Sequence, residues 1–302
     1  MKTLHFVSIF VLLLALHAGC GSAASAPESE VPTLASIAEA ETARLMEAGA
    51  RRVDLLVLDL RGGEAIAQAH HGPRGPVPLA STIKPLTLAA ALRAGFDANA
   101  VLSGEGGRWD VPGGALEDWR PVESMSVADA IAHSSNIGVA KVAEAVGVSE
   151  VVSSLGQLGL GESLTEADWV ERGLHLASHG FDGEPLALAQ AYARVLRGRW
   201  LPPEETDLLK AMLEGAVERG TGDAAQIEGL AVGGKTGTAR IEDGIGAWFI
   251  GAVPMHDPEL LIAVYAEVDE GNGGSVAAPA FRRVVLQACD AGLLQGCSTS
   301  SL

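Results

Sequence analysis

The sequence is poor in basic residues. Its 21 lysines and arginines stand against 38 aspartates and glutamates, so the formal net charge is −17. Proteins that bind nucleic acid need patches of lysine and arginine to neutralise phosphates. The composition therefore excludes nucleic acid as a partner. Net charge reports on solubility and encounter rather than on the fold, so it decides little else.

Long hydrophobic runs are also missing beyond the N-terminus. No later stretch reaches the roughly 18 consecutive apolar residues that indicate a membrane-spanning helix. The hydrophobic content is nevertheless 48%, which is enough for a sizeable core. A chain of 302 residues then allows one large globular domain or two small ones.

Residues 1–20 have the pattern of a signal peptide, because a lysine precedes the apolar run 6–16. The run ends in Ala-Gly-Cys, which is similar to a bacterial lipobox and predicts a lipid on Cys20. Cleavage near Ala24 or Ala26 without a lipid, and an uncleaved anchor, are the alternatives. All three interpretations predict an exported, extracytoplasmic or periplasmic domain, and the first attaches it to the membrane through Cys20.

Cysteine is scarce as well, with three in the chain. Apart from Cys20 there are Cys289 and Cys297, which an exported protein can pair as a disulfide. Two independent thiols fit the sequence equally well, so both interpretations stay open.

The order of patterns along the chain predicts one domain with two lobes. Residues 21–32 are small, polar and acidic, as in a tether, and residues 291–302 form a polar tail. Between them, two runs predict a β-hairpin near the start and three more predict strands near the end, with a helix outside each group. The helices are expected at 33–48 and 277–294, and the strands at 51–60, 64–70, 229–240, 246–254 and 259–268.

We therefore expect an α/β (α+β) fold. Its five-stranded antiparallel sheet is flanked by the terminal helices, and a large all-helical lobe, about residues 86–218, is inserted between the strands. Because the chain leaves the sheet and returns to it, one two-lobed domain fits better than two sequential domains. A cleft between the lobes is then the natural ligand site.

The stretch "STIKP" puts a hydroxyl at Ser81 and an amine at Lys84 at the expected start of a helix. Residues three apart share one helical face, so Lys84 is expected to reach the Ser81 hydroxyl. By itself the pattern also fits an ordinary helix start with an exposed lysine, because Ser-x-x-Lys occurs about once by chance in a chain of this length.

Two further short patterns follow in order. "SSN" places Ser134 and Asn136 at a helix end, and "KTGT" places Lys235 to Thr238 at the start of a strand. Each has an ordinary explanation, since Ser and Asn are common at helix ends and a polar strand can lie at a sheet edge. Gly237 would let another part of the backbone approach closely.

Together the three patterns, separated by about 50 and about 100 residues, form the signature of the penicillin-recognising acyl-serine enzymes. From about residue 34 to 290 the chain resembles the transpeptidase domain of class B penicillin-binding proteins. Further segments carry the resemblance: "SSNIGVAKVAEAVG", "GEPLALAQAYARVL", "GAVERGTGDAA" and "WFIGAVP". Class B proteins usually carry a pedestal domain ahead of the catalytic one, and we expect none here.

The resemblance implies a peptidoglycan D,D-transpeptidase that acts on D-Ala-D-Ala stem peptides. It implies that Ser81 is the nucleophile, Lys84 its base and Ser134 a proton relay, with Lys235 beside them. The substrate would be held by Asn136, Thr236, Gly237 and Thr238. β-Lactam antibiotics would be covalent inhibitors, and the family chemistry needs no metal or organic cofactor.

Three other functions remain open: a D,D-carboxypeptidase, a serine β-lactamase and a non-catalytic penicillin or peptidoglycan sensor. Rapid hydrolysis in class A β-lactamases uses a loop containing asparagine, and no asparagine lies between Ile137 and Gly234. Neither Tyr192 nor Tyr265 is followed two residues later by asparagine, as the class C pattern requires. We therefore expect slow deacylation by water.

Overall fold

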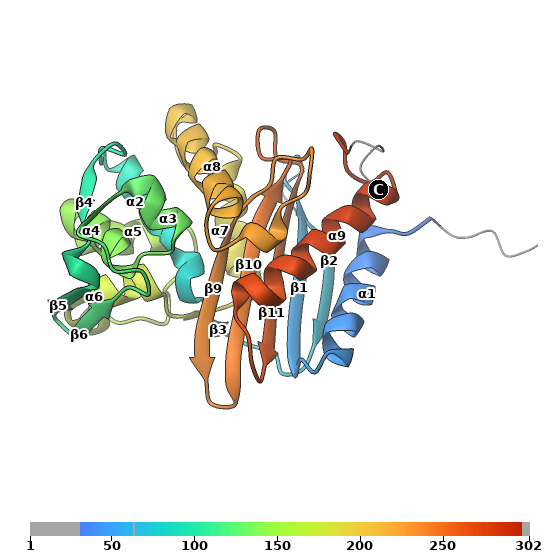
Figure 1. The fold of residues 1–302 in the computed structure, drawn as a ribbon, viewed down its shortest axis with the longest axis horizontal. Helices are drawn as coiled ribbons and strands as arrows, with labels where there is room; N and C mark the ends of the chain where they lie inside the picture. Colours follow the sequence, from blue (N-terminus) through green and yellow to red (C-terminus); the bar gives the residue numbers. More distant parts are fainter. Residues whose placement is uncertain (1–30, 63, 298–302) are drawn as a thin grey trace, which may run out of the picture. The chain divides into compact units, whose positions relative to one another are not determined.

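The computed structural model describes residues 31–62 and 64–297. Its main feature is a five-stranded antiparallel sheet with the strand order β2-β1-β11-β10-β9 (Figure 1). The strands are β1 (Arg52–Asp59), β2 (Ala65–His71), β9 (Gly233–Ile241), β10 (Gly244–Val253) and β11 (Leu260–Val268). The predicted sheet is confirmed, and β9 lies at one edge of it.

One face of the sheet is covered by helices α1 (Leu34–Glu47) and α9 (Ala278–Asp290), as predicted (Figure 1). The apolar stripes of both helices pack on inward-facing strand residues such as Leu55 and Ile262 in one core cluster. Arg283 of α9 donates three hydrogen bonds to the buried carboxylate of Glu41 on α1. This ion pair links the first helix of the domain to the last.

The segment between β2 and β9 forms the second lobe and also covers the other face of the sheet. Helix α7 contacts β1 and β11, and α8 contacts β9. A sheet covered on both faces needs apolar residues on both, which explains the nearly continuous apolar run of β1. The helices are α2 (Lys84–Arg93), α3 (Val127–Ala132), α4 (Asn136–Val146), α5 (Val148–Gln157), α6 (Glu166–His179), α7 (Pro185–Leu196) and α8 (Pro203–Glu218).

The lobe is mostly helical but also contains short antiparallel pairs. They join β3 (Val77–Pro78) to β8 (Asp182–Gly183), β4 (Val101–Ser103) to β7 (Ser124–Ser126), and β5 (Arg108–Val111) to β6 (Gly114–Glu117). The last two pairs lie in the Gly-rich stretch 101–126. Short 3-10 or π-helical segments also occur: η1 (Ala80–Ile83), η2 (Glu105–Gly107), η3 (Asp223–Ala225) and η4 (Gly273–Ala277).

Cys289 and Cys297 form a disulfide, which decides between the two interpretations left open by the sequence. The segment after α9 folds back on the domain, because Leu294 is buried and the Gln295 N–H donates to Glu259. The predicted signal peptide, Cys20 and nearly all of the predicted tether lie outside the described residues. Among the residues described, no helix combines the length and the apolar character needed to cross a membrane.

Candidate active site

Ser81 lies in a tight turn that precedes α2. The turn is the 3-10 segment η1, and the α-helix itself begins only at Lys84, later than the sequence suggested. Ala80 has a φ of 51°, a left-handed conformation that is unfavourable for a residue with a side chain. The backbone of Gly180 presses against this turn, since a Cβ there would lie 2.7 Å from the Ala80 carbonyl oxygen.

Side chains from both lobes hold this turn in place. The Tyr192 hydroxyl of α7 donates a 2.6 Å hydrogen bond to the Thr82 carbonyl. The Trp248 indole N–H of β10 donates to the Pro78 carbonyl at 2.9 Å. Both donors are buried, so their bonds are not exchanged with water and hold Ser81 against the sheet.

The edge strand β9 lies directly against the Ser81 turn. A Cβ at Gly237 would lie 3.0 Å from Thr82 Cγ2 and 3.0 Å from Trp248 Cβ, so only glycine fits without displacement. The Leu79 carbonyl oxygen would lie 3.3 Å from the same Cβ, so another part of the backbone does approach Gly237 closely, as expected. Because β9 has a strand partner on one side only, alternate backbone groups remain free of the sheet ladder on the side of the turn.

Ser134 lies in the connection between α3 and α4, and Asn136 is the first residue of α4. Ser134 has a φ of 58°, a second left-handed non-glycine residue in the site. Ser135 is the N-cap of α4, where its hydroxyl accepts the Gly138 N–H at 2.8 Å. Capping fixes the start of α4 and with it the direction of the Asn136 side chain.

Two lysine side chains converge on Ser134. Lys84 Nζ donates to the Ser134 carbonyl at 2.6 Å, to Ser134 Oγ at 3.1 Å and to Asn136 Oδ1 at 2.7 Å. Lys235 Nζ donates to Ser134 Oγ at 2.9 Å and to the Thr236 carbonyl at 3.0 Å. One hydroxyl therefore joins residues from the beginning, middle and end of the domain.

Both lysines have no solvent-exposed surface, and this changes their acidity. Burial, followed by the positive charge of Lys235, lowers the pKa of Lys84 well below its ordinary value, while Asp118 opposes this. Burial alone lowers the pKa of Lys235 to about 7. The lowered pKa makes the Lys84 ammonium easier to deprotonate, which suits it to act as a base, and near pH 7 Lys235 is partly protonated.

The predicted site residues surround one open cleft of about 710 Å³. Ser81, Ser134, Asn136, Thr236 and Thr238 line it, together with Trp119, Thr221 and Asn272. The two lysines lie behind this surface. The expected contact between Lys84 and the Ser81 hydroxyl is not among the hydrogen bonds of the described residues, where Lys84 instead binds Ser134 and Asn136.

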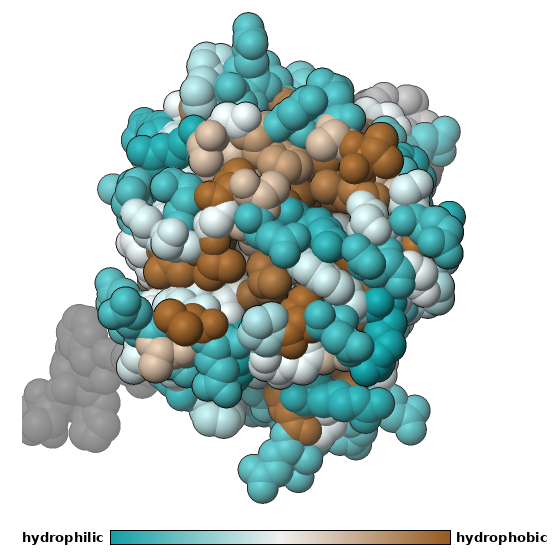
Figure 2. All heavy atoms as spheres, turned by 90° about the vertical axis from the view of Figure 1, so that its left-hand side faces the viewer, coloured by the Kyte–Doolittle hydropathy of each residue, from teal (hydrophilic) through white to brown (hydrophobic). Residues whose placement is uncertain are grey.

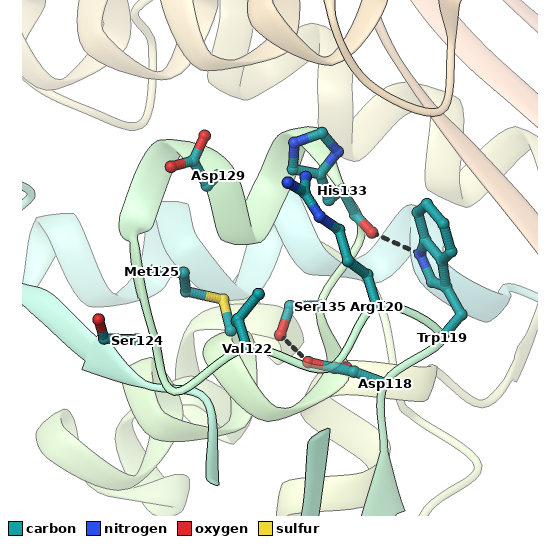
Figure 3. Close-up of a pocket in the computed structure, with 9 residues that line it drawn as sticks. All are labelled: Asp118, Trp119, Arg120, Val122, Ser124, Met125, Asp129, His133 and Ser135. Carbon is teal, nitrogen blue, oxygen red and sulfur yellow. Dashed lines mark hydrogen bonds between the residues drawn. The ribbon is translucent and has the colours of Figure 1, made fainter. Parts of the chain in front are cut away.

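Asp118 is a site residue that sequence reasoning missed. Its carboxylate accepts the Ser135 hydroxyl and the backbone N–H groups of Asn136 and Ile137 at the N-terminus of α4. Figure 3 shows Asp118 facing Ser135 beside a small pocket of about 150 Å³. Asp118 belongs to an irregular segment without periodicity, so no local pattern indicated it.

Neighbouring residues extend the same network. The indole of Trp119, next to Asp118, donates to the His133 carbonyl at 2.8 Å, a contact drawn in Figure 3, although its side chain is largely exposed. Thr221, which follows α8, hydrogen-bonds the Thr236 hydroxyl of β9. Both residues border the cleft, and sequence reasoning had identified neither.

No set of three or more metal-binding side chains occurs in the part of the chain that the structure describes. His175 and His179 have the spacing of a ligand pair, and their ring centroids are 5.8 Å apart. They lie at the end of α6 without a third ligand, so the arrangement gives no support for a metal site there.

The model of the family described as "Penicillin binding protein transpeptidase domain" matches residues 74–286 of this chain. Among curated relatives, "Probable peptidoglycan D,D-transpeptidase PbpC" of Pseudomonas aeruginosa is 28% identical over 250 residues, covering 68% of this chain and 44% of the relative. "Probable peptidoglycan D,D-transpeptidase FtsI" of Caulobacter vibrioides is 30% identical over 265 residues, covering 68% and 45%. The chain thus spans a little under half the length of these relatives.

Solved structures give the same fold. The transpeptidase domain of penicillin-binding protein 3 from Burkholderia pseudomallei superposes with a TM-score of 0.79 at 22% identity, covering 88% of this chain and 96% of that one. The transpeptidase domain of FtsI4 from Legionella pneumophila gives a TM-score of 0.68 at 26% identity, covering 85% and 97%.

Proposed function

The chain belongs to the penicillin-binding protein transpeptidase family, and we propose that it is a peptidoglycan D,D-transpeptidase that acts through an acyl-enzyme on Ser81. One observation carries this proposal: the Ser134 hydroxyl accepts hydrogen bonds from both Lys84 and Lys235, and it lines the same cleft as Ser81. This arrangement supplies a nucleophile, an amine of lowered pKa and a proton path in one place.

In the proposed acylation, Ser81 Oγ attacks the carbonyl carbon of the penultimate D-alanine and Lys84 Nζ takes the hydroxyl proton. The C–N bond then breaks, and Ser134 passes a proton to the leaving D-alanine amine. The backbone N–H groups of Ser81 and Thr238 stabilise the oxyanion, each contributing about 3 kcal/mol to the transition state. An acceptor amine from a second stem peptide attacks the acyl-enzyme and releases Ser81.

The proposed substrate contacts come from the two sides of the cleft. Asn136 holds an amide of the stem peptide from the helical lobe. Lys235, Thr236 and Thr238 on β9 hold the terminal carboxylate, and Gly237 allows β9 to approach the turn. Support comes from the buried Lys235 behind two hydroxyl-bearing residues, a suitable arrangement for an anion. The steps require neither a metal nor an organic cofactor.

β-Lactams are proposed to acylate Ser81 and to be released slowly. The test is incubation of the purified domain with fluorescent benzylpenicillin, followed by denaturing electrophoresis. A labelled band that persists in the native protein and is absent in Ser81→Ala is expected. Rapid turnover that leaves no labelled band would instead indicate a β-lactamase.

The exact reaction is tested with peptidoglycan substrates. Purified lipid-linked peptidoglycan should yield cross-linked dimers together with free D-alanine, and Ser81→Ala should yield neither. Release of D-alanine without cross-links would identify a carboxypeptidase. Drug binding with no D-alanine release from a pentapeptide would identify a sensor.

We further propose that the catalytic domain spans residues 33–290, and that the protein is exported and held at a membrane by a lipid on Cys20. Metabolic labelling with a clickable fatty acid should mark the native protein but not Cys20→Ser. An unlabelled native protein that is still exported would favour ordinary cleavage near Ala24 or Ala26.

A further inference from the structure

A second hollow lies on the helical lobe, between α5 and α6. It has a volume of about 740 Å³ and shares no lining residue with the cleft around Ser81. Its surface is mainly apolar and includes Val148, Val152, Leu160, Leu164, Trp169 and Leu174. Figure 2 views the side of the molecule that carries this lobe, where hydrophobic side chains gather in hollows between hydrophilic ones. We call this hollow the α5–α6 groove.

The border of the α5–α6 groove is acidic. Glu144, Glu162, Glu166 and Glu171 line it, and no lysine or arginine is among its lining residues. Glu144 also forms a salt bridge with Lys141 of α4, so the other three glutamates carry the argument from charge. Next to these carboxylates, the Val170 side chain on α6 is 78% exposed. An apolar surface bordered by charge of one sign is the usual form of a site for a partner of opposite charge.

Two glycines show that the groove belongs to the packed arrangement of the helices. A Cβ at Gly173 of α6 would lie 2.4 Å from Val148 Cγ1, so the helices are in close contact there. A Cβ at Gly156 of α5 would meet no atom within 4 Å. Gly156 therefore opens into the groove, and a larger side chain there would occupy it without disturbing the core.

The walls of the groove restrict what form a partner can take. Its lining comes mainly from α5, α6 and the turn between them, and includes no residue of a strand. A partner therefore cannot add a strand and pair its backbone with a free edge. A helix satisfies its own backbone hydrogen bonds and presents apolar side chains at positions i, i+3, i+4 and i+7.

We propose that the α5–α6 groove binds an amphipathic helix of a partner protein. The apolar face of that helix lies on Val148, Val152 and Trp169, and its lysine and arginine side chains pair with the glutamates of the border. A second copy of this chain is a poor occupant, because the chain carries a net charge of −17 and would repel itself. Anionic lipids are disfavoured for the same reason.

The first experiment measures fluorescence anisotropy of a labelled helical peptide built from leucine and lysine at amphipathic spacing, added to the whole protein. We expect saturable binding, at least tenfold weaker for Gly156→Trp, which places an indole in the groove. Ala40→Trp, on the exposed side of α1, is the matched control and should bind as the native protein does. Equal binding by native protein and Gly156→Trp would overturn the proposal, as would absence of binding.

The second experiment separates the groove from general attraction to an acidic protein. Glu162→Gln with Glu166→Gln removes two charges at the border, and Glu39→Gln with Glu47→Gln removes two exposed charges on α1. The first pair should weaken binding several-fold more than the second, and added salt should reduce the difference. Equal weakening by both pairs would show non-specific attraction and contradict the proposal.

Sedimentation of the native protein and of Gly156→Trp completes the test. Both are expected to be monomeric at the concentrations used for binding. Self-association that Gly156→Trp abolishes would make a second copy the occupant and overturn the proposal. Labelling of each variant with fluorescent penicillin verifies its folding, since none of the substituted residues lines the Ser81 cleft.

Discussion

The domain buries charged groups in two different ways. On the sheet face, Arg283 donates three hydrogen bonds to the fully buried carboxylate of Glu41, so opposite charges lie together. Between the lobes, Lys84 and Lys235 are both fully buried, and neither forms a salt bridge with a carboxylate among the described residues. They share a neutral hydroxyl instead.

The ion pair on the sheet face contributes to structure, whereas the two lysines between the lobes are suited to proton transfer. The buried ion pair between Glu41 and Arg283 joins two helices. Two buried amines without a counter-ion lose protons more easily, which is unfavourable for stability but makes Lys84 a base.

The largest effect is expected for Lys84→Met. Loss of the proposed base should slow acylation by fluorescent penicillin about 10²–10⁴-fold. The folded-state pKa of Lys84 lies below its unfolded value, so the unfolded chain binds the extra proton and burial costs more stability as pH falls. Lys84→Met should therefore raise the melting temperature, and more at pH 7 than at pH 10. A melting temperature below that of the native protein at both pH 7 and pH 10 would contradict the idea that burial of Lys84 reduces stability.

Glu41→Gln should have the opposite effects, with lower stability and an unchanged acylation rate. It leaves Arg283 without its carboxylate partner and is expected to lower the free energy of unfolding by about 1–3 kcal/mol. The acylation rate should be unchanged, because α1 and α9 lie on the sheet face away from α7 and α8. Urea unfolding measures the first quantity and penicillin labelling the second. A tenfold loss of acylation in a protein that remains folded would contradict this separation.

Asp118→Asn should reduce acylation about tenfold, because hydrogen bonds to a charged carboxylate at the start of α4 are lost. The Asp118 charge also raises the Lys84 pKa, so its removal should move the acidic limb of the pH profile to lower pH. A merely structural role would lower the rate and leave that limb in place. Rates measured from pH 4 to 9 distinguish the two.

The smallest effect concerns Lys235, whose pKa is lowered to about 7 by burial. If its ammonium binds the substrate carboxylate, kcat/KM for D-alanine release should fall several-fold as pH rises above 7. On the acidic side, kcat/KM should fall once Lys84 becomes protonated. In Lys235→Arg the guanidinium stays charged, so the basic limb should disappear even if the maximum rate is reduced. A profile that stays flat from pH 6 to 9 in the native protein would argue against this role.

Strong local patterns allowed much of the fold to be predicted. The strands expected at 51–60 and 259–268 are β1 and β11. The helices expected at 33–48 and 277–294 are α1 and α9, and their ends differ from the prediction by at most four residues. The start of α2 was less exact, because Tyr192 and Gly180, distant in sequence, hold Ser81 in a 3-10 turn. The short strand pairs around Asp118 lie in an irregular region where residue type alone says little.

For the candidate site as well, local patterns predicted one part and only the packing of distant segments decided the rest. The order and spacing of Ser81-x-x-Lys84, Ser134-x-Asn136 and Lys235-Thr236-Gly237 determined the family, because side-chain chemistry in sequence order is enough for that. Only the tertiary structure decided that the two lysines meet on the Ser134 hydroxyl, that Asp118 holds the start of α4 and that Cys289 pairs with Cys297. The α5–α6 groove also emerged only there. Distances, burial and pKa values depend on which distant segments pack together, and a local pattern of residues does not contain that information.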